Sequence, residues 1–346
     1  LSALAAASRA RSSATIMAIT GSVGKTTTRA MLEQVAAAQF PTHASVGNLN
    51  NHIGLPLSLA RLPLFARYGI FEIGMNHPGE IGKLSALLQP GLCLITNIGT
   101  AHIEHFGEGH AGIARAKAEI FAGGKGGVAI LPKDTPFHGL LLEEAKNQGI
   151  EGILSFGYDM HADAHLISAK VIGEKTRVQA RILGRNVDYV LPVPGEHMAL
   201  NSIAVLMAAE VSRLDVTKAI ATLAKFEPLK GRGQRKQFGQ ITVIDESYNA
   251  SPLSMVAALR VLGQSHPENG GRRIAVLGEM LELGATAAEA HALLSIELKA
   301  QKIDQVFCCG APMKHLWNAL PASMQGQWAE DAASLAPAVV AADGTR

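Results

Sequence analysis

The chain has 346 residues, of which 48% are hydrophobic and 17% are charged, and its formal net charge is +2. This length is sufficient for two domains with a core each. The near-neutral charge argues against both a nucleic-acid-binding surface and an acidic tail, and no apolar run approaches the roughly 18 residues that a membrane-spanning helix requires. We therefore expect small anionic ligands that bind at a local site.

The cysteines and the first residues indicate where the protein works. Cys93, Cys308 and Cys309 follow no metal-binding spacing, and an adjacent pair inside an apolar run is typical of buried thiols in a reducing compartment. Residues 1–11 place their arginines after the apolar part, the reverse of a signal peptide, and resemble the last helix of a preceding segment. We expect a cytoplasmic protein.

An apolar stretch at residues 15–20 predicts a buried strand, and the sequence Thr-Gly-Ser-Val-Gly-Lys-Thr-Thr at 20–27 follows it and opens a helix over 25–39. A glycine loop that ends in Lys-Thr at such a junction is typical of a phosphate cradle. The usual motif has a glycine where this chain has Ile19, so the loop is a shortened variant. A glycine turn without a ligand is the alternative, and we favour a site for ATP or GTP.

The loop residues have separate expected tasks. Gly21 and Gly24 allow the backbone to turn its amides inward. Lys25 can reach the terminal phosphates, and the hydroxyl of Thr26 can bind Mg²⁺. The following helix adds the positive end of its dipole to the site.

Strands and helices alternate from residue 15 to about 156, which predicts a parallel α/β sheet. We expect strands at 69–73, 92–96, 127–131 and 152–155, and helices at 79–88, 110–122 and 138–148. Residues 43–56 are polar, rich in turn residues and too long for a simple connection, so we expect a binding loop in which Asn51 contacts a ligand or only shapes a turn. Residues 162–192 change to alternating runs joined by glycine turns, which predicts antiparallel hairpins at the side of the sheet.

A second, smaller α/β unit follows a break in the helical pattern. An alanine-rich helix to about 212 and a helix at 216–225 lead to residues 227–233, where proline and two glycines interrupt the pattern. Beyond them we expect strands at 240–245, 273–277 and 304–309, and helices at 286–300, from 252 and from 312. These boundaries divide the chain into a linker remnant at 1–13, a central domain at 14–229 and an incomplete carboxy-terminal domain at 230–346.

Three further side chains are candidates for chemistry. Glu72 closes an apolar strand at its carboxyl end, where a carboxylate suits Mg²⁺, and a surface or capping role is the alternative. His102 follows the next strand, but its surroundings do not have the spacing of a zinc site, and a structural histidine is the alternative. Lys117 lies on a helix with an apolar face, where spacing alone predicts only a solvated lysine.

Eight motifs, in order, resemble those of the Mur ligase family. They lie at 20–27, 47–56, 72–81, 96–107, 116–120, 195–201, 231–232 and 245–252. The match runs from about residue 5 to 310, and the motifs are jointly specific. The resemblance is strongest to those members that join D-alanyl-D-alanine to UDP-N-acetylmuramoyl-tripeptide, through Asn50, Asn51 and the segments 247–250 and 277–284.

The resemblance implies a site for ATP and two Mg²⁺ ions. In that plan Thr26 and Glu72 coordinate Mg²⁺, and His102 binds a second ion together with a CO₂-derived carbamate on Lys117. Asn201 contacts adenine, Asp245 and Glu246 contact ribose, and Arg232 reaches the γ-phosphate from the second domain. The implied catalytic residues are Lys25, Glu72, His102, Lys117 and Arg232. The implied ATP-binding residues are Gly21, Ser22, Val23, Gly24, Lys25, Thr26, Thr27, Asn201, Asp245, Glu246 and Asn249, and the implied substrate contacts are Asn50 and Asn51.

The sequence also departs from the family pattern. Glu246 and Ser251 stand where the family has aspartate and asparagine, and Glu279 replaces a further aspartate, so the reach of each side chain differs. The family's amino-terminal domain, which binds the uridine diphosphate, and its closing Lys-Gly-Ser motif have no counterpart. The sequence therefore resembles a central and a carboxy-terminal domain.

These observations predict an α/β protein: a P-loop parallel-sheet ATPase domain with a small antiparallel side sheet, followed by a smaller Rossmann-like domain. We predict a monomeric, ADP-forming amide ligase of cytoplasmic peptidoglycan synthesis that acts through an acyl phosphate. Its partners are UDP-N-acetylmuramoyl-tripeptide and D-alanyl-D-alanine. Another Mur ligase or a folylpolyglutamate synthetase is the alternative within this fold. A P-loop nucleotide-binding protein without ligase activity is the alternative from another class.

Overall fold

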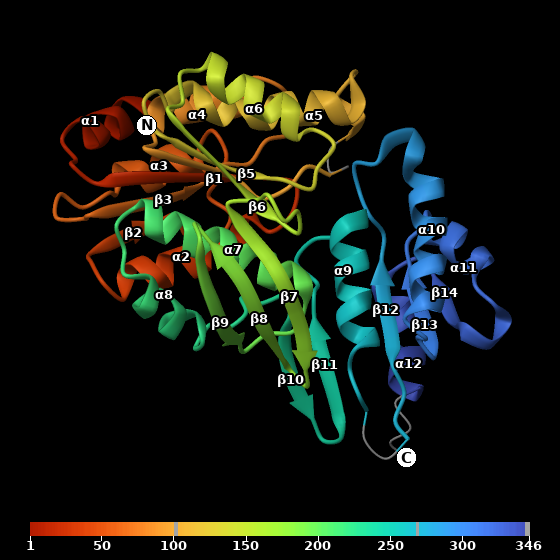
Figure 1. The fold of residues 1–346 in the computed structure, drawn as a ribbon. Coiled ribbons are helices and arrows are strands. Elements are labelled where there is room, and N and C mark those ends of the chain that lie inside the picture. The colour runs from red at the N-terminus through yellow and green to blue at the C-terminus, as the bar shows by residue number, and fades with distance from the viewer. Residues whose placement is uncertain (100–102, 268–269, 343–346) are drawn as a thin grey trace. The chain divides into compact units, whose positions relative to one another are not determined.

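A computed structural model describes residues 1–99, 103–267 and 270–342, and it describes His105 by its backbone alone. The described chain divides into two compact units. The first comprises residues 1–99 and 105–226, and the second comprises residues 227–342 together with 103 and 104. Each unit has a sheet and helices of its own (Figure 1).

The first unit is built on one mostly parallel sheet. Its described strands follow the order β2-β3-β1-β4-β5-β6-β7-β8-β9. Neighbouring strands are parallel up to the β6–β7 pair, and β7, β8 and β9 are antiparallel to one another. The strands are β1 (Thr15–Thr20), β2 (Thr42–Ala44), β3 (Tyr68–Glu72), β4 (Leu92–Ile95), β5 (Val128–Pro132), β6 (Gly152–Gly157), β7 (Ala164–Ile172), β8 (Lys175–Ile182) and β9 (Arg185–Leu191).

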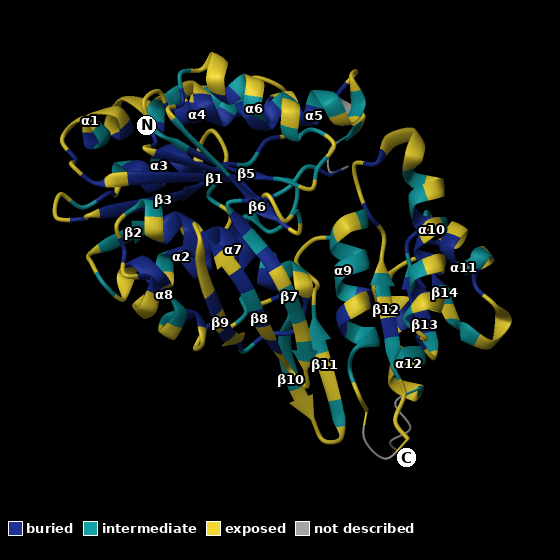
Figure 2. Ribbon diagram, in the orientation of Figure 1, coloured by how far each residue is buried: buried dark blue, intermediate teal, exposed yellow. Residues whose placement is uncertain are grey.

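Helices cover both faces of this sheet, which explains its apolar central strands. Every residue of β3 and β4 is buried, and β1 is buried after its first residue (Figure 2). Strands that are buried on both faces have continuous apolar sequences in place of alternating ones. One helical layer contains α1 (Ser2–Ala10), α3 (Gly54–Ala60), α4 (Glu80–Leu88), α5 (Gly109–Ala118) and α6 (His138–Asn147), and the other contains α2 (Lys25–Ala37), α7 (Glu196–Val211) and α8 (Val216–Leu223). The short 3₁₀ turns are η1 (Ile103–His105) and η2 (Glu119–Gly123).

The expected alternation of strands and helices is confirmed, with two differences of detail. The antiparallel hairpins are present, but they continue the main sheet because Phe156 pairs with Ala164 and Gly157 pairs with His165. The stretch expected as one loop at 43–56 contains the end of β2 and the start of α3. Only two residues of β2 lie in this stretch, and α3 has seven residues, so neither element shows a clear periodic pattern in the sequence.

The second unit contains a parallel sheet and a separate hairpin. The sheet has the order β12-β13-β14, and β10 pairs with β11 in antiparallel fashion. Its elements are β10 (Gln234–Phe238), β11 (Ile241–Asp245), α9 (Pro252–Gly263), β12 (Ile274–Gly278), η3 (Gly284–Thr286), α10 (Ala287–Ala300), β13 (Gln305–Cys309), α11 (Met313–Ala319), η4 (Ala322–Met324), β14 (Gln325–Ala329) and α12 (Ala332–Ala341).

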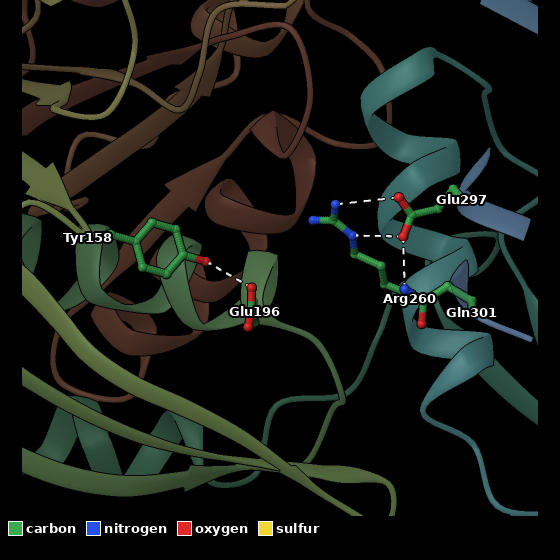
Figure 3. A network of polar contacts seen from close by, with 5 residues as sticks. All are labelled: Tyr158, Glu196, Arg260, Glu297 and Gln301. Carbon is green, nitrogen blue, oxygen red and sulfur yellow. Dashed lines mark hydrogen bonds and ion pairs between the residues drawn. The ribbon is translucent and has the colours of Figure 1, made fainter. Parts of the chain in front are cut away.

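Helix α9 begins at a strong start signal and packs on α10. The hydroxyl of Ser251 accepts from the amide of Ser254, the Ser254 hydroxyl accepts from the amide of Ser251, and Pro252 occupies the first turn. The guanidinium of Arg260 on α9 then reaches the carboxylate of Glu297 on α10, with Nε 3.0 Å from Oε1 (Figure 3). Such an exposed pair contributes little stability, and the buried apolar residues between the helices hold them together.

Two strands and one α-helix of this unit were not predicted. Strand β10 is polar and half-exposed, β14 contains glycine and two glutamines, and α12 contains Pro337. Each departs from the apolar periodicity by which strands and helices are recognised. Among the described residues, no helix is long and apolar enough to span a membrane.

Candidate nucleotide and metal site

The loop between β1 and α2 has the backbone that its sequence predicts. Gly21 and Gly24 have φ angles of 148° and 83°, which residues other than glycine rarely adopt. A Cβ at Gly21 would lie 1.9 Å from Oγ1 of Thr96, so this position also requires glycine for space. The chain thereby passes close to the end of β4 before α2 begins at Lys25.

Residues at the end of β4 hold this loop in shape. The side chain of Asn97 accepts from the Val23 amide at 3.0 Å and donates to the Val23 carbonyl at 3.1 Å. The hydroxyl of Thr96 donates to the same carbonyl at 2.6 Å, and the carbonyl of Asn97 accepts from the Ser22 amide at 3.1 Å. The loop is therefore fixed by the neighbouring strand in addition to its own turns.

The start of α2 presents donors suited to phosphate. The first helical bond runs from the amide of Thr28 to the carbonyl of Gly24. Within the part of the chain that the structure describes, the amides of Gly24, Thr26 and Thr27 donate to no protein group. The ammonium of Lys25 donates to the carbonyl of Gly21 at 2.7 Å, folded back over the loop. Free amides at a helix start, together with a lysine, form a site for an anion.

Glu72 ends the strand beside β1 and has the character of a metal ligand. Ile19 pairs with Glu72 across the two strands, so the carboxylate lies next to the start of the loop. Glu72 is 2% exposed, its Oε1 accepts from Nδ2 of Asn50 at 2.7 Å, and its Oε2 is buried without a hydrogen-bond partner. A buried carboxylate oxygen without a donor is costly unless a cation or another donor meets it.

This arrangement fits Mg²⁺, which prefers oxygen ligands and commonly takes only one or two carboxylates from the protein. Among the described residues, no group of three or more His, Cys, Asp or Glu side chains is placed to hold a metal ion. Coordination of Mg²⁺ by Glu72 and by the hydroxyl of Thr26 stays a prediction.

Asn50 and Asn51 differ in what they do. Asn50 supports Glu72, and its carbonyl also accepts from the amide of Gly74 at 2.9 Å. The side-chain oxygen of Asn51 accepts from the amides of Ile53 and Gly54 at 3.1 and 2.8 Å, and so shapes the start of α3. A substrate contact by either residue stays a prediction.

Lys117 is a buried lysine of the first unit. It lies on α5 and is 2% exposed. Burial, and the positive charge of Lys25, hold the pKa of Lys117 well below its ordinary value. This environment favours the neutral, nucleophilic form of the amine over the charged form, relative to an exposed lysine.

Asn201, on α7, lies against the nucleotide loop. A Cβ at Gly24 would be 3.0 Å from its Oδ1, so its side chain reaches the start of α2. At the first turn of α7, the hydroxyl of Tyr158 donates to Glu196 at 3.3 Å, which joins the loop after β6 to that helix (Figure 3).

The other predicted site residues lie in the second unit or outside the described residues. His102 is outside the described residues. In the second unit, the guanidinium of Arg232 stacks on the ring of Tyr248, 4.0 Å from its centroid. The hydroxyl and amide of Ser247 donate to Asp245 and lower the pKa of that carboxyl, with a smaller contribution from Lys236. Glu246 and Asn249 lie in the same turn, and both are exposed. A role for these residues at the nucleotide stays a prediction.

Sequence reasoning did not predict that Thr96 and Asn97 hold the loop at 21–24. Both belong to the motif at 96–107, directly after an apolar strand. That position was the available signal, because the ends of neighbouring parallel strands meet at one edge of the sheet. Their contact with the loop at 21–24 depends on the β1–β4 pairing, which a single sequence does not reveal.

Comparisons with known proteins identify the family of this chain. Residues 19–209 match the Mur ligase middle domain, and residues 231–344 match the Mur ligase glutamate ligase domain. The UDP-N-acetylmuramoyl-tripeptide–D-alanyl-D-alanine ligase of Rickettsia prowazekii (strain Madrid E) is 37% identical over 90% of this chain and 69% of its own length, and that of Bacillus subtilis (strain 168) is 35% identical over 85% and 62%. A crystal structure of MurF from Acinetobacter baumannii superposes with a TM-score of 0.91 at 31% identity, covering 98% of this chain and 73% of that one. The chain thus spans about two thirds of the length of these curated relatives. It belongs to the Mur ligase family.

Proposed function

We propose that this chain carries the ligase activity that the names of its relatives state, joining D-alanyl-D-alanine to UDP-N-acetylmuramoyl-tripeptide, and that ATP drives the reaction. The observation that carries the proposal is the phosphate-binding loop at 20–27 placed beside Glu72, whose buried Oε2 has no partner. A loop for phosphate and a carboxylate for a cation are the two parts that ATP with Mg²⁺ requires.

The loop residues would hold the phosphates of ATP. The amides of Gly24, Thr26 and Thr27 would donate to phosphate oxygens, and Lys25 would exchange the carbonyl of Gly21 for the β- and γ-phosphates. The contacts from Asn97 keep these donors in place before ATP arrives, so little reorganisation is needed at the moment of reaction.

Thr26 and Glu72 would hold Mg²⁺, which when bound supplies neutralisation of charge on the phosphate oxygens. Asn50 holds the carboxylate of Glu72 through its bond to Oε1, which would leave Oε2 for the ion.

The reaction itself needs two displacements. A terminal carboxylate oxygen of the tripeptide would attack the γ-phosphorus, the bond to the β-phosphate oxygen would break, and ADP would leave. The amine of D-alanyl-D-alanine would then attack the acyl carbon of the acyl phosphate, lose a proton, and expel phosphate. The protein contributes chiefly positioning and charge neutralisation to both steps.

Lys117 would serve this site as a carbamate. Its neutral amine can add to CO₂ and release a proton, which gives a carboxylate at the end of a long side chain and puts a negative charge where Lys25 disfavours a positive one. We propose that this group and His102 bind a second Mg²⁺. Unmodified Lys117 in a Mg²⁺-nucleotide complex, or full activity of Lys117→Ala, contradicts this assignment.

The remaining predicted residues would complete the nucleotide site. Asn201 would contact adenine, for which its place beside Gly24 is favourable. Arg232 would reach the γ-phosphate, and Asp245, Glu246 and Asn249 would contact the nucleotide from the second unit. We propose a monomer that acts in the cytoplasm, in keeping with free thiols at Cys93, Cys308 and Cys309.

Release of phosphate from ATP tests this function. The tripeptide substrate and D-alanyl-D-alanine are added singly and together, with Mg²⁺ present. We expect sustained release only when both are present. Release with a different amine would assign another ligase activity, and release that ignores every added carboxylate and amine would assign a nucleotide-hydrolysing protein instead.

A further inference from the structure

Glu119 makes contacts that the nucleotide site described above does not use. It follows Lys117 by two residues, where α5 ends and η2 begins. Its carboxylate accepts from the amide of Gly79 at 2.6 Å and from the amide of Gly82 at 3.0 Å. Both amides belong to the start of α4, a different helix.

The start of α4 needs such a partner. Gly79 is the residue before the helix, has a φ of 83°, and has no side chain with which to cap the first-turn amides. A carboxylate at a helix start also interacts favourably with the helix dipole. Glu119, forty positions further along the chain, accepts from the Gly82 amide as a serine or aspartate side chain at position 79 would, and it also accepts from the Gly79 amide.

The segment that ends at this cap begins at the proposed metal ligand. Directly after Glu72, the amide of Ile73 donates to the carbonyl of Ile19, and the amide of Gly74 donates to the carbonyl of Asn50. Further along, the carboxylate of Glu80 accepts from the amides of Asn76 and His77 at 2.7 and 3.3 Å. The connection from Glu72 to α4 is thus fixed by β1 and Asn50 at one end and by Glu119 at the other.

We propose that Glu119 is a positioning residue that fixes the segment of Lys117 to the segment of Glu72 and thereby sets the Mg²⁺-dependent part of nucleotide binding. The inference rests on the proposed function, because it assumes that both residues meet metal-bound nucleotide. Lys117 and Glu72 come from different elements, α5 and β3, and Glu119 is a polar link between the end of one and the loop that follows the other. Groups that orient metal ligands typically cost 10- to 100-fold in affinity or activity when they are lost.

Binding of ADP to the full chain, measured by calorimetry as Mg²⁺ is titrated, tests this inference without requiring turnover. The variants are Glu119→Ala and Glu119→Gln, and the control is Glu143→Ala, an exposed glutamate on α6. We expect the Mg²⁺ concentration for half-maximal enhancement to rise about tenfold in Glu119→Ala, less in Glu119→Gln, and not at all in Glu143→Ala. Affinity for ADP in the presence of EDTA should be equal in all four proteins, because the loop at 20–27 is unchanged.

A purely structural role for Glu119 predicts something different. It would lower the fraction of folded, binding-competent protein, and so the binding stoichiometry, without shifting the Mg²⁺ dependence. A wild-type Mg²⁺ dependence in folded Glu119→Ala overturns the inference. If that variant fails to fold, a wild-type dependence in Glu119→Gln does so. If the wild-type chain binds no ADP, or binds it without regard to Mg²⁺, the proposed function fails first and the inference falls with it.

Discussion

Lys117 is a lysine whose surroundings oppose its charge. Its side chain is buried on α5, and Lys25 is the charged neighbour that lowers its pKa further. A group of this kind is stabilised in the folded protein either as a neutral amine or after conversion to an anion. Of these two forms, the anion is the one that could bind a metal ion such as Mg²⁺. In the unmodified protein, the cost of burying a charged amine should appear in the pH dependence of the free energy of unfolding.

In buffer freed of CO₂, we expect the free energy of unfolding of the wild type to rise with pH more steeply than that of Lys117→Met. Between the lowered pKa and the ordinary value of 10.5, the unfolded state binds more protons than the folded state, so stability increases as the pH rises through this window. Urea unfolding at several pH values between 7 and 9 measures the slopes. Lys146→Met, at an exposed position, should behave as the wild type. Equal slopes for wild type and Lys117→Met would show that the buried amine carries no such penalty.

Lys25 should matter for rate far more than for folding. Its ammonium donates to the carbonyls of Gly21 and Ser22 in the loop that would bind the phosphates. Lys25→Ala should lower the rate of substrate-dependent phosphate release by about 10² or more, since charge leaving the γ-phosphate would lose a neutralising partner. Thermal unfolding should change little, and Lys146→Ala should keep full activity. A near-normal kcat in folded Lys25→Ala would remove the lysine from the mechanism.

At the scale of elements, the loop from β1 to α2 depends on close approach to the end of β4. Gly21→Ala would place a Cβ 1.9 Å from Oγ1 of Thr96, and we expect it to destabilise the fold by about 1–3 kcal/mol. Thr96→Ala in the same protein should recover part of this loss, because the clashing atom is removed. Chemical denaturation of the two single variants and the double variant gives the coupling between the sites. Strictly additive losses would mean that the clash is relieved elsewhere.

The two hydrogen bonds between the Asn97 side chain and the backbone of Val23 should strengthen nucleotide binding. Removing them in Asn97→Ala leaves the loop amides less ordered, and at about 0.5–1.5 kcal/mol for each bond the affinity for ADP should fall about tenfold. Calorimetry at fixed Mg²⁺ measures the change. Asn147→Ala, at the exposed end of α6, is the matched control. Unchanged affinity in Asn97→Ala would show that the loop keeps its shape without this strand.

The parts of the structure that short sequence patterns define could be predicted, and contacts between residues far apart in the chain could not. The phosphate-binding loop and the buried strands β1, β3 and β4 were predicted because a short motif and continuous apolar runs define them. Two contacts were not predicted: the cap of α4 by Glu119 and the bond between Asn97 and Val23. Each joins residues that are far apart in the chain. Polar strands such as β10 were not predicted for another reason. They bury too little apolar surface to show the alternation of apolar and polar residues by which a strand is recognised.

At the scale of the whole molecule, the chain consists of two α/β units that were both expected from the alternation of strands and helices. The first holds the loop at 20–27, Glu72, Lys117 and Asn201. The second holds Arg232 and the turn at 245–249. The proposed reaction needs residues of both, so its chemistry is the proper test of the molecule as a whole.

The central claim is that ATP activates a carboxylate as an acyl phosphate, and isotope transfer tests it most directly. UDP-N-acetylmuramoyl-tripeptide labelled with ¹⁸O in its terminal carboxylate is incubated with the chain, Mg²⁺-ATP and D-alanyl-D-alanine, and the released phosphate is analysed by mass spectrometry. Because a carboxylate oxygen bonds to the γ-phosphorus and leaves with it, we predict one ¹⁸O atom in each phosphate that is released with the amide product. Unlabelled phosphate formed together with that product would contradict the account.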